Sequence, residues 1–241
     1  MSLMNSTRGK SSSVRETKFK DLQKAAVDFR YLLNRGYPRK AALEIVGNRY
    51  GLTFDERHLL HRGVFSDADS KARRKKIIST KGIRSKDLAI DGHNVLITVE
   101  AGLSGRPLIL ADDGFIRDIS GVSGGFKKTE VTEKAIRLIV TSLKGWRPRH
   151  ALFLFDAPIS KSGILAQELR VLLKKEGLLG DALAVNVPET TLIGFQGIVA
   201  TSDTAIIDQS RRVVDLAGYV LTRRVKARSI LRWRKKRGDI F

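Results

Sequence analysis

The sequence contains no cysteine in its 241 residues. That absence excludes disulfide bonds, thiolate zinc sites such as zinc fingers, and a cysteine nucleophile. No apolar run approaches the roughly 18–20 residues needed to cross a bilayer. Residues 1–18 are Ser-rich and charged, without the apolar core of a signal peptide. We therefore expect a soluble, cytoplasmic protein that does not associate with membranes.

Acidic residues are scarce relative to basic ones. The chain has 25 Asp and Glu against 45 Lys and Arg, which gives a formal net charge of +20 at pH 7. Clustered Lys and Arg bind phosphate backbones and release their counterions, so we expect a polyanionic partner. Nucleic acid is favoured over a membrane surface, because the basic segments do not follow amphipathic faces with large aromatic residues.

Residues 17–65 predict a small all-α domain. Apolar residues recur at three- and four-residue spacing over 19–33, a second helical pattern covers 38–50, and Thr53 with Glu56 has the spacing of a capping box that starts a third helix. This domain is either a helix-turn-helix-like reader of nucleic acid or a docking bundle with a solvated basic surface.

Three other segments are polar or strongly basic. Residues 1–16 predict a disordered lead, residues 66–86 a basic linker, and residues 221–241 a basic tail, in which an indole would stack on a base while its neighbours bind phosphates. The alternatives are a solubilising hinge and a frayed terminus. The candidate nucleic-acid-binding residues of the linker and tail are Arg73, Arg74, Lys75, Lys76, Arg232, Trp233, Arg234, Lys235 and Lys236.

Residues 87–220 alternate between strand-like and helical patterns. Short apolar runs predict strands at 88–91, 151–155, 182–187 and 197–202, separated by helical patterns. Asp112-Asp113-Gly114 between two apolar runs predicts a hairpin. Strands separated by helices imply right-handed crossovers, so we expect an α/β domain with three α/β/α layers around a mainly parallel sheet.

Three of the predicted strands lead into an aspartate, namely Asp91, Asp156 and Asp203. The carboxyl ends of parallel strands share the edge at which open α/β sheets bind ligands. Converging carboxylates are costly unless they share protons or bind a cation, and Mg²⁺ prefers carboxylate oxygens. Each aspartate alone has an alternative role as a helix cap or turn residue. The occurrence of all three in this order favours a metal site.

The motifs Ile90-Asp91-Gly92-His93-Asn94, Phe155-Asp156-Ala157 and Ala200-Thr201-Ser202-Asp203 resemble those of the PIN-like and NYN nucleases. The likeness covers residues 88–220. The whole chain further resembles an archaeal family in which a helical domain of unknown function precedes a PIN-like region. The resemblance implies a PIN-like fold and hydrolysis of RNA phosphodiesters with Mg²⁺ or Mn²⁺.

The resemblance also implies roles for individual residues. Asp91 and Asp203 would be metal ligands, Asp156 a ligand directly or through water, and Asn94 a group that orients Asp91 or a phosphate. Asp208 follows Asp203 by about one helical turn and would add a carboxylate.

A Gly-rich stretch between the first two acids, residues 121–128, ends in Lys127 and Lys128. These lysines would reach substrate phosphates from a flexible lid. The stretch lacks the Gly-Lys-Ser/Thr ending of a P-loop, which argues against an ATPase.

The leading functional hypothesis is a Mg- or Mn-dependent endoribonuclease whose helical module and tail bind RNA, with ribosomal and transfer RNA as candidates. A second hypothesis is a non-catalytic RNA-binding or ribosome-associated protein. It is motivated by the NYN pattern's Ala-Asp pair before Thr-Ser-Asp, where this chain offers only Asp181 and Glu189. A third makes the helical domain a DNA-binding module and the chain a regulator.

Overall fold

The computed structural model describes residues 7–119, 129–159, 161–227 and 230–233. Four helices form the N-terminal region, namely α1 (Thr7–Asn34), α2 (Arg39–Arg49), α3 (Phe54–Gly63) and α4 (Asp67–Lys76). The three helices predicted from the sequence are confirmed, and Thr53 caps α3 in a full capping box with Glu56. Helix α1 begins at Thr7, inside the segment for which we expected no regular structure.

The segment expected to be a linker, 66–86, contains regular structure. Ser66 accepts a hydrogen bond from the main chain of Asp69 and so caps α4, and a short 3-10 helix, η1 (Thr80–Ile83), follows. Ile77 forms a parallel bridge with Val213. The segment is therefore packed against the rest of the protein, and its role as an open basic hinge is not supported.

The α/β region is built on a five-stranded sheet in the order β5-β4-β1-β6-β7, in which every neighbouring pair is parallel. This confirms the expected mainly parallel sheet. Its strands are β1 (Asp87–Asp91), β4 (His150–Asp156), β5 (Gly180–Val185), β6 (Ile198–Ala200) and β7 (Val213–Val214).

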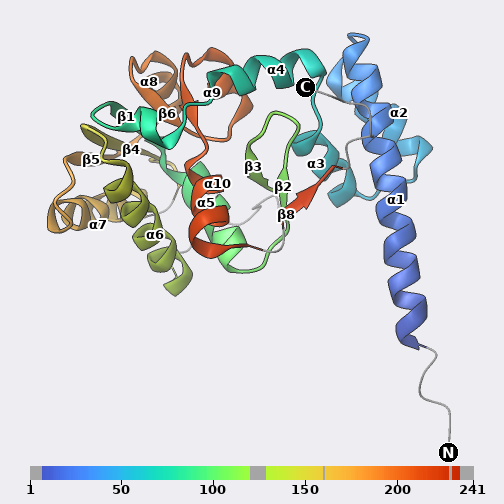
Figure 1. Cartoon of the computed structure of the whole chain (residues 1–241), viewed down its shortest axis with the longest axis horizontal. Coiled ribbons are helices and arrows are strands. Elements are labelled where there is room, and N and C mark those ends of the chain that lie inside the picture. Colours follow the sequence, from blue (N-terminus) through green and yellow to red (C-terminus); the bar gives the residue numbers. More distant parts are fainter. Residues whose placement is uncertain (1–6, 120–128, 160, 228–229, 234–241) are drawn as a thin grey trace, which may run out of the picture.

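Helices cover both faces of this sheet (Figure 1). Leu88, Ile90 and Phe153 point to a face covered by α5 (Gly92–Leu103), α6 (Glu130–Trp146), α7 (Ser162–Lys175), α10 (Leu216–Tyr219) and the π-helical η2 (Val220–Val225). Ala89 and Leu154 point to the other face, against α8 (Pro188–Gly194) and α9 (Thr204–Gln209). This alternation is the period-two pattern of a strand that is buried on both faces.

A second, three-stranded sheet joins the two regions. The predicted hairpin is confirmed as β2 (Leu108–Leu110) and β3 (Ile116–Asp118), and β8 (Ile230–Arg232) pairs with β2 in parallel. Figure 1 shows these strands between the main sheet and helices α1 and α3. The hairpin's Ile109 is buried in the core of the helical region.

Part of the expected basic tail therefore belongs to the fold. The indole Nε1 of Trp233 donates to the carbonyl oxygen of Gly63 at 3.0 Å, and the ring packs against the core of the helical region. Trp233 thus packs within the protein, and its stacking on a base stays a prediction. None of the helices in the described part of the chain is both long enough and apolar enough to cross a membrane.

Candidate active site at the carboxyl edge of the sheet

The strand order places a topological switch point beside β1. The chain proceeds from β1 to β4 and β5 on one side, then returns to β6 and β7 on the other side of β1. The segment after β1 enters α5 on one face, whereas the segment after β6 enters α9 on the opposite face. Such a divergence opens a crevice at the carboxyl ends of the two strands, where open α/β sheets bind ligands.

The strand register brings the three motif aspartates to one edge of the sheet. Asp91 is level with Leu154 of β4, and Ile90 is level with Ala200 of β6. Asp91 and Asp156 end β1 and β4, and Asp203 follows the last residue of β6 by three positions. All three aspartates therefore lie at the carboxyl edge of the sheet.

The Thr-Ser-Asp segment is held against the motif of Asp91 and Asn94 by hydrogen bonds. The Thr201 hydroxyl donates to Asp91 Oδ2 at 2.8 Å and accepts the main-chain N–H of Asp203 at 3.0 Å. Asn94 Oδ1 accepts both the N–H of Ser202, at 2.9 Å, and the Ser202 hydroxyl, at 3.0 Å. Asn94 thus holds the loop that carries Asp203, and Thr201 fixes the Asp91 carboxylate in the same arrangement.

Asp91 is a buried acid with an uncompensated charge. Its pKa is raised from 3.8 to about 7, chiefly by burial and also by the negative charges of Asp203 and Asp156, against the lowering effect of hydrogen bonds from Thr201 and the Asn94 main chain. No Lys or Arg in the described part of the chain forms an ion pair with it. A cation placed beside Asp91 would therefore relieve a cost that the protein itself leaves in place.

The carboxylates of the other two aspartates each have contacts within the protein. Asp203 Oδ1 caps α9 by accepting the N–H groups of Ala205 and Ile206, at 2.8 and 3.2 Å, while its Oδ2 has no partner among the described residues. Asp156 Oδ2 lies 2.9 Å from Nδ1 of His93, which also accepts the main-chain N–H of Asp156 at 3.0 Å. Burial lowers the pKa of His93, against the raising effect of the Asp156 carboxylate.

The donor set matches a hard divalent cation in chemistry but does not form a closed cage. Within the described residues, no group of three or more acidic or imidazole side chains is close enough to hold a metal ion by itself. Mg²⁺ is commonly bound through one or two carboxylates, with water and substrate phosphates completing the shell. Asp91 and Asp203 would supply the carboxylates of such an open site, and the resemblance implies that Asp156 would take part directly or through water.

Asp208 does not join this group. Its carboxylate forms a two-pronged ion pair with Arg73, with Nε–Oδ1 and Nη2–Oδ2 distances of 2.7 Å. The short helix α9 turns Asp208 toward α4, and the linked arginine was not foreseen because it lies 135 positions away in the sequence. Asp208 therefore links two parts of the protein, rather than adding a carboxylate to the site.

The basic run on α4 is also largely used internally. Arg73 is buried between Asp208 and Asp113, Arg74 donates to the carbonyl of Asp112, and Lys76 Nζ donates to the carbonyls of Ile207 and Asp208. Lys75 is exposed. Arg73 is therefore occupied by two carboxylates, which argues against its predicted role in RNA binding, whereas Arg74 and Lys76 contact carbonyl oxygens and their role stays a prediction.

The remaining candidate RNA-binding residues are only partly described. The side chain of Arg232 is exposed at the end of β8. The others lie outside the described residues, namely Lys127, Lys128, Arg234, Lys235 and Lys236.

A cleft of about 480 Å³ opens beside Asp203, between the helical region and the sheet. It is lined by four arginines that the sequence analysis did not bring together, namely Arg39, Arg62, Arg73 and Arg117. They come from α2, α3, α4 and β3, so no local spacing connects them. We call this feature the arginine cleft.

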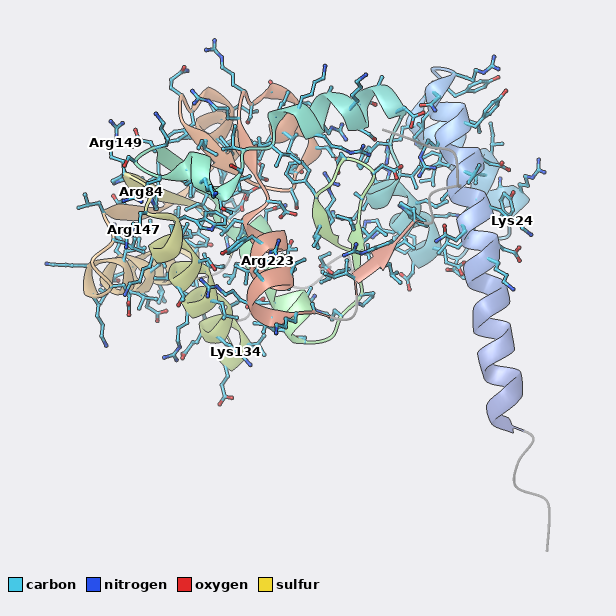
Figure 2. All side chains as sticks on the ribbon, in the orientation of Figure 1. Lys24, Arg84, Lys134, Arg147, Arg149 and Arg223 are labelled. Atoms are coloured by element: carbon cyan, nitrogen blue, oxygen red, sulfur yellow. The ribbon has the colours of Figure 1, made fainter. Side chains whose placement is uncertain are left out.

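Positive charge is also present far from this cleft. Figure 2 shows Arg84, Arg147 and Arg149 near one another on the side of the molecule away from α1. All three are exposed near the start of β1, at the amino edge of the sheet, where Arg149 pairs with Asp87. Net charge alone therefore does not locate a binding site, which has to be argued from geometry.

The raised pKa of Asp91 predicts a pH-dependent stability. Between about pH 4 and pH 7 the folded state binds more protons than the unfolded state, so the free energy of unfolding falls as the pH rises through this window. Buried Asp215, whose pKa burial raises to about 6, contributes in the same direction. Denaturant unfolding in EDTA should show a smaller decline for Asp91→Asn than for the wild type. Equal declines in the free energy of unfolding of the two proteins would contradict the raised pKa assigned to Asp91.

Comparison with known proteins adds the family. Residues 80–219 match the model described as Domain of unknown function (DUF5616), and residues 21–76 match Protein of unknown function (DUF434). The chain is 38% identical over 197 residues to Uncharacterized protein MJ0935 of Methanocaldococcus jannaschii, an alignment that covers 81% of this chain and 94% of that protein. No solved structure matches the chain. The chain therefore belongs to the DUF5616 family, with a DUF434 region preceding the α/β region.

Proposed function

We propose that this protein is a divalent-metal-dependent nuclease with a PIN-like α/β domain, and that it hydrolyses RNA phosphodiesters at the carboxyl edge of its five-stranded sheet. The observation that carries the proposal is the state of Asp91. It is a buried carboxyl with a pKa near 7, without a basic partner among the described residues and linked through Thr201 to the loop of Asp203. Its position is the switch point of the sheet.

The PIN-like assignment is supported by the placement of the motifs. The first acid ends β1, the second ends β4, and Thr-Ser-Asp follows β6, so all three lie at one edge of one sheet. The similar archaeal protein supports an archaeal origin for the family.

In this proposal each residue of the site has a separate role. Asp91 and Asp203 hold Mg²⁺ or Mn²⁺, Thr201 fixes the Asp91 carboxylate, and Asn94 keeps the Asp203 loop against α5. Asp156, which contacts His93, orients water at the edge of the site. The bound cation would lower the pKa of an attacking water and neutralise charge on the scissile phosphate. No side chain is needed as a nucleophile.

RNA as the substrate is supported by charge. A formal net charge of +20 favours a phosphate polymer. The arginine cleft includes Asp203 in its lining, so arginines lie near this carboxylate of the site.

The test is a cleavage assay with labelled single-stranded RNA in Mn²⁺, in Mg²⁺ and in EDTA. We expect cleavage with either metal, none in EDTA, and loss of cleavage in Asp203→Asn. A matched control is Asp181→Asn, which changes a partly exposed aspartate on β5 and should leave the rate unaltered. Metal-independent cleavage, or cleavage unaffected by Asp203→Asn, would contradict the proposal.

A second candidate is RNA binding without hydrolysis. It is favoured by the lack, within the described residues, of three acidic or imidazole groups placed to enclose a metal ion. On this alternative, the wild type leaves RNA uncut with both metals, while Asp91→Asn and Asp203→Asn bind RNA as well as the wild type or more tightly. If the wild type cuts RNA and either variant loses that activity, binding without hydrolysis is excluded.

A further inference from the structure

We propose that the arginine cleft is a subsite for one nucleotide unit of a polynucleotide strand, with the phosphate on Arg39 and Arg62 and the base on Tyr37. The inference rests on the proposed function, because it names the place where the substrate strand enters the site at Asp203. It makes the N-terminal helical region a wall of the substrate-binding site, rather than a separate docking module.

Two of the four arginines are already neutralised within the protein. Arg117 holds buried Asp113 through two bonds of 2.8 Å and donates Nε–H to the Ser202 carbonyl at 2.8 Å. Arg73 is divided between Asp208 and Asp113. These two arginines therefore shape the cleft, and their charge is not available to a ligand.

The other two form no ion pair with a carboxylate among the described residues, although the charges of Asp69 and Asp113 act on Arg39 and those of Asp118 and Asp203 act on Arg62. Arg39 donates to the carbonyls of His61 and Val64, the latter at 2.7 Å, and its guanidinium lies 4.6 Å from the ring centre of Phe65. Burial and the charges of Arg73 and Arg117 lower its pKa to about 10. A buried guanidinium without an ion-pair partner among the described residues is stabilised by an incoming anion, and guanidinium forks suit phosphate oxygens.

Arg62 is the less completely hydrogen-bonded of these two arginines. Its Nε is buried and has no hydrogen-bond partner in the described part of the chain. Burial and the charge of Arg117 lower its pKa. An unpaired buried donor is costly, and native proteins pair nearly all such groups with protein, water or ligand.

The shape and lining of the cleft favour more than a bare phosphate. Its volume of about 480 Å³ lies within the range of small-molecule sites. Tyr37 lines it with half of its surface exposed, and an exposed aromatic ring is a common platform for a nucleic-acid base. The carboxylates of Asp69 and Asp203 also line it, but neither forms an ion pair with Arg39 or Arg62 among the described residues.

The experiment measures binding by the full-length protein in EDTA, where metal-dependent turnover is absent. Anisotropy of a labelled single-stranded RNA reports binding, and inorganic phosphate and a nucleoside monophosphate serve as competitors. Arg62→Gln should raise the Kd for RNA by roughly tenfold. The matched control Arg84→Gln removes the same charge from an exposed arginine at the amino edge and should raise the Kd about twofold or less.

Tyr37→Ala provides an independent variant, because this exposed side chain can be removed with little risk to the fold. It should weaken binding of RNA and of the monophosphate, while competition by inorganic phosphate stays unchanged. Equal effects of Arg62→Gln and Arg84→Gln on RNA binding would overturn the proposal. So would an Arg62→Gln effect confined to inorganic phosphate, which would make the cleft a free-anion site.

Failure of this inference is distinguishable from failure of the proposed function. If Arg62→Gln binds RNA normally while Asp203→Asn abolishes cleavage, the nuclease stands and the subsite is wrong. If the wild type cuts no RNA but Arg62→Gln specifically loses RNA binding, the subsite stands and the nuclease is wrong.

Discussion

Replacing Asp91 with asparagine (Asp91→Asn) is expected to lower the metal-dependent RNA cleavage rate by roughly 100-fold or more. Even residues that only support metal ligands commonly account for about 10–100-fold in affinity or activity, and Asp91 is proposed as a ligand itself. Asparagine keeps an oxygen for the Thr201 hydroxyl, which donates at 2.8 Å, but loses the charge. The fold should persist, and RNA binding in EDTA should be unchanged or stronger.

The matched control is Asp87→Asn at the other end of the same strand. Asp87 is half-buried at the amino edge of the sheet and pairs with exposed Arg149. The substitution is chemically identical but distant from the site, so the cleavage rate should stay within about twofold of the wild type, as expected for an exposed ion pair. A similar loss in both variants, or no loss in Asp91→Asn, would contradict the proposed role of Asp91.

Asp113→Asn is expected to lower the free energy of unfolding by about 3–5 kcal/mol, the usual cost of removing one partner from a buried ion pair. The Asp113 side chain is fully buried and pairs with Arg117 and Arg73, whose side chains are only 3% and 8% exposed. Without it, two buried guanidinium groups lose a shared counter-charge. Denaturant unfolding at neutral pH measures the effect.

An exposed ion pair provides the comparison for this variant. Asp21 pairs with Lys24 on α1, and both side chains are about half exposed or more, at 47% and 67%. Asp21→Asn should change the free energy of unfolding by about 1 kcal/mol or less. Equal effects of the two substitutions would show that the Asp113 cluster does not hold the hairpin against α4.

The regular elements with a clear hydrophobic period could be predicted from the sequence. The stripe from residue 19 to residue 33 lies within α1, the Thr53 capping box starts α3, and the Asp112-Asp113-Gly114 turn joins β2 to β3. These signals are local, because they depend on residues three or four positions apart or on a single turn. The parallel sheet followed from the alternation of strands and helices.

Helix α4 could not be predicted in this way. Its sequence, Asp67–Lys76, has no apolar stripe, and it is held by Ser66 at its N-terminus and by polar contacts with distant residues. Strand β8 was missed for a related reason, since its pairing with β2 depends on residues more than a hundred positions away. Basic segments that appear open in the sequence are used here to connect the two regions.

Only part of the candidate site could be predicted from the sequence. Asp91, Asp156 and Asp203 could be found because each ends or follows a recognisable strand, but the raised pKa of Asp91 depends on burial that no motif encodes. The arginine cleft had no sequence signal, because its arginines come from four separate elements. The role of Asp208 could not be predicted either, because it pairs with Arg73, which lies 135 positions away in the sequence.

The most direct test of the proposed metal site is the anomalous scattering of Mn²⁺ soaked into crystals of the full-length wild-type protein and of Asp91→Asn. We expect one strong Mn²⁺ peak within coordination distance of Asp91 and Asp203 in the wild type, and its loss in Asp91→Asn. A wild-type structure without Mn²⁺ at these two carboxylates, or with Mn²⁺ bound equally well in the variant, would contradict it.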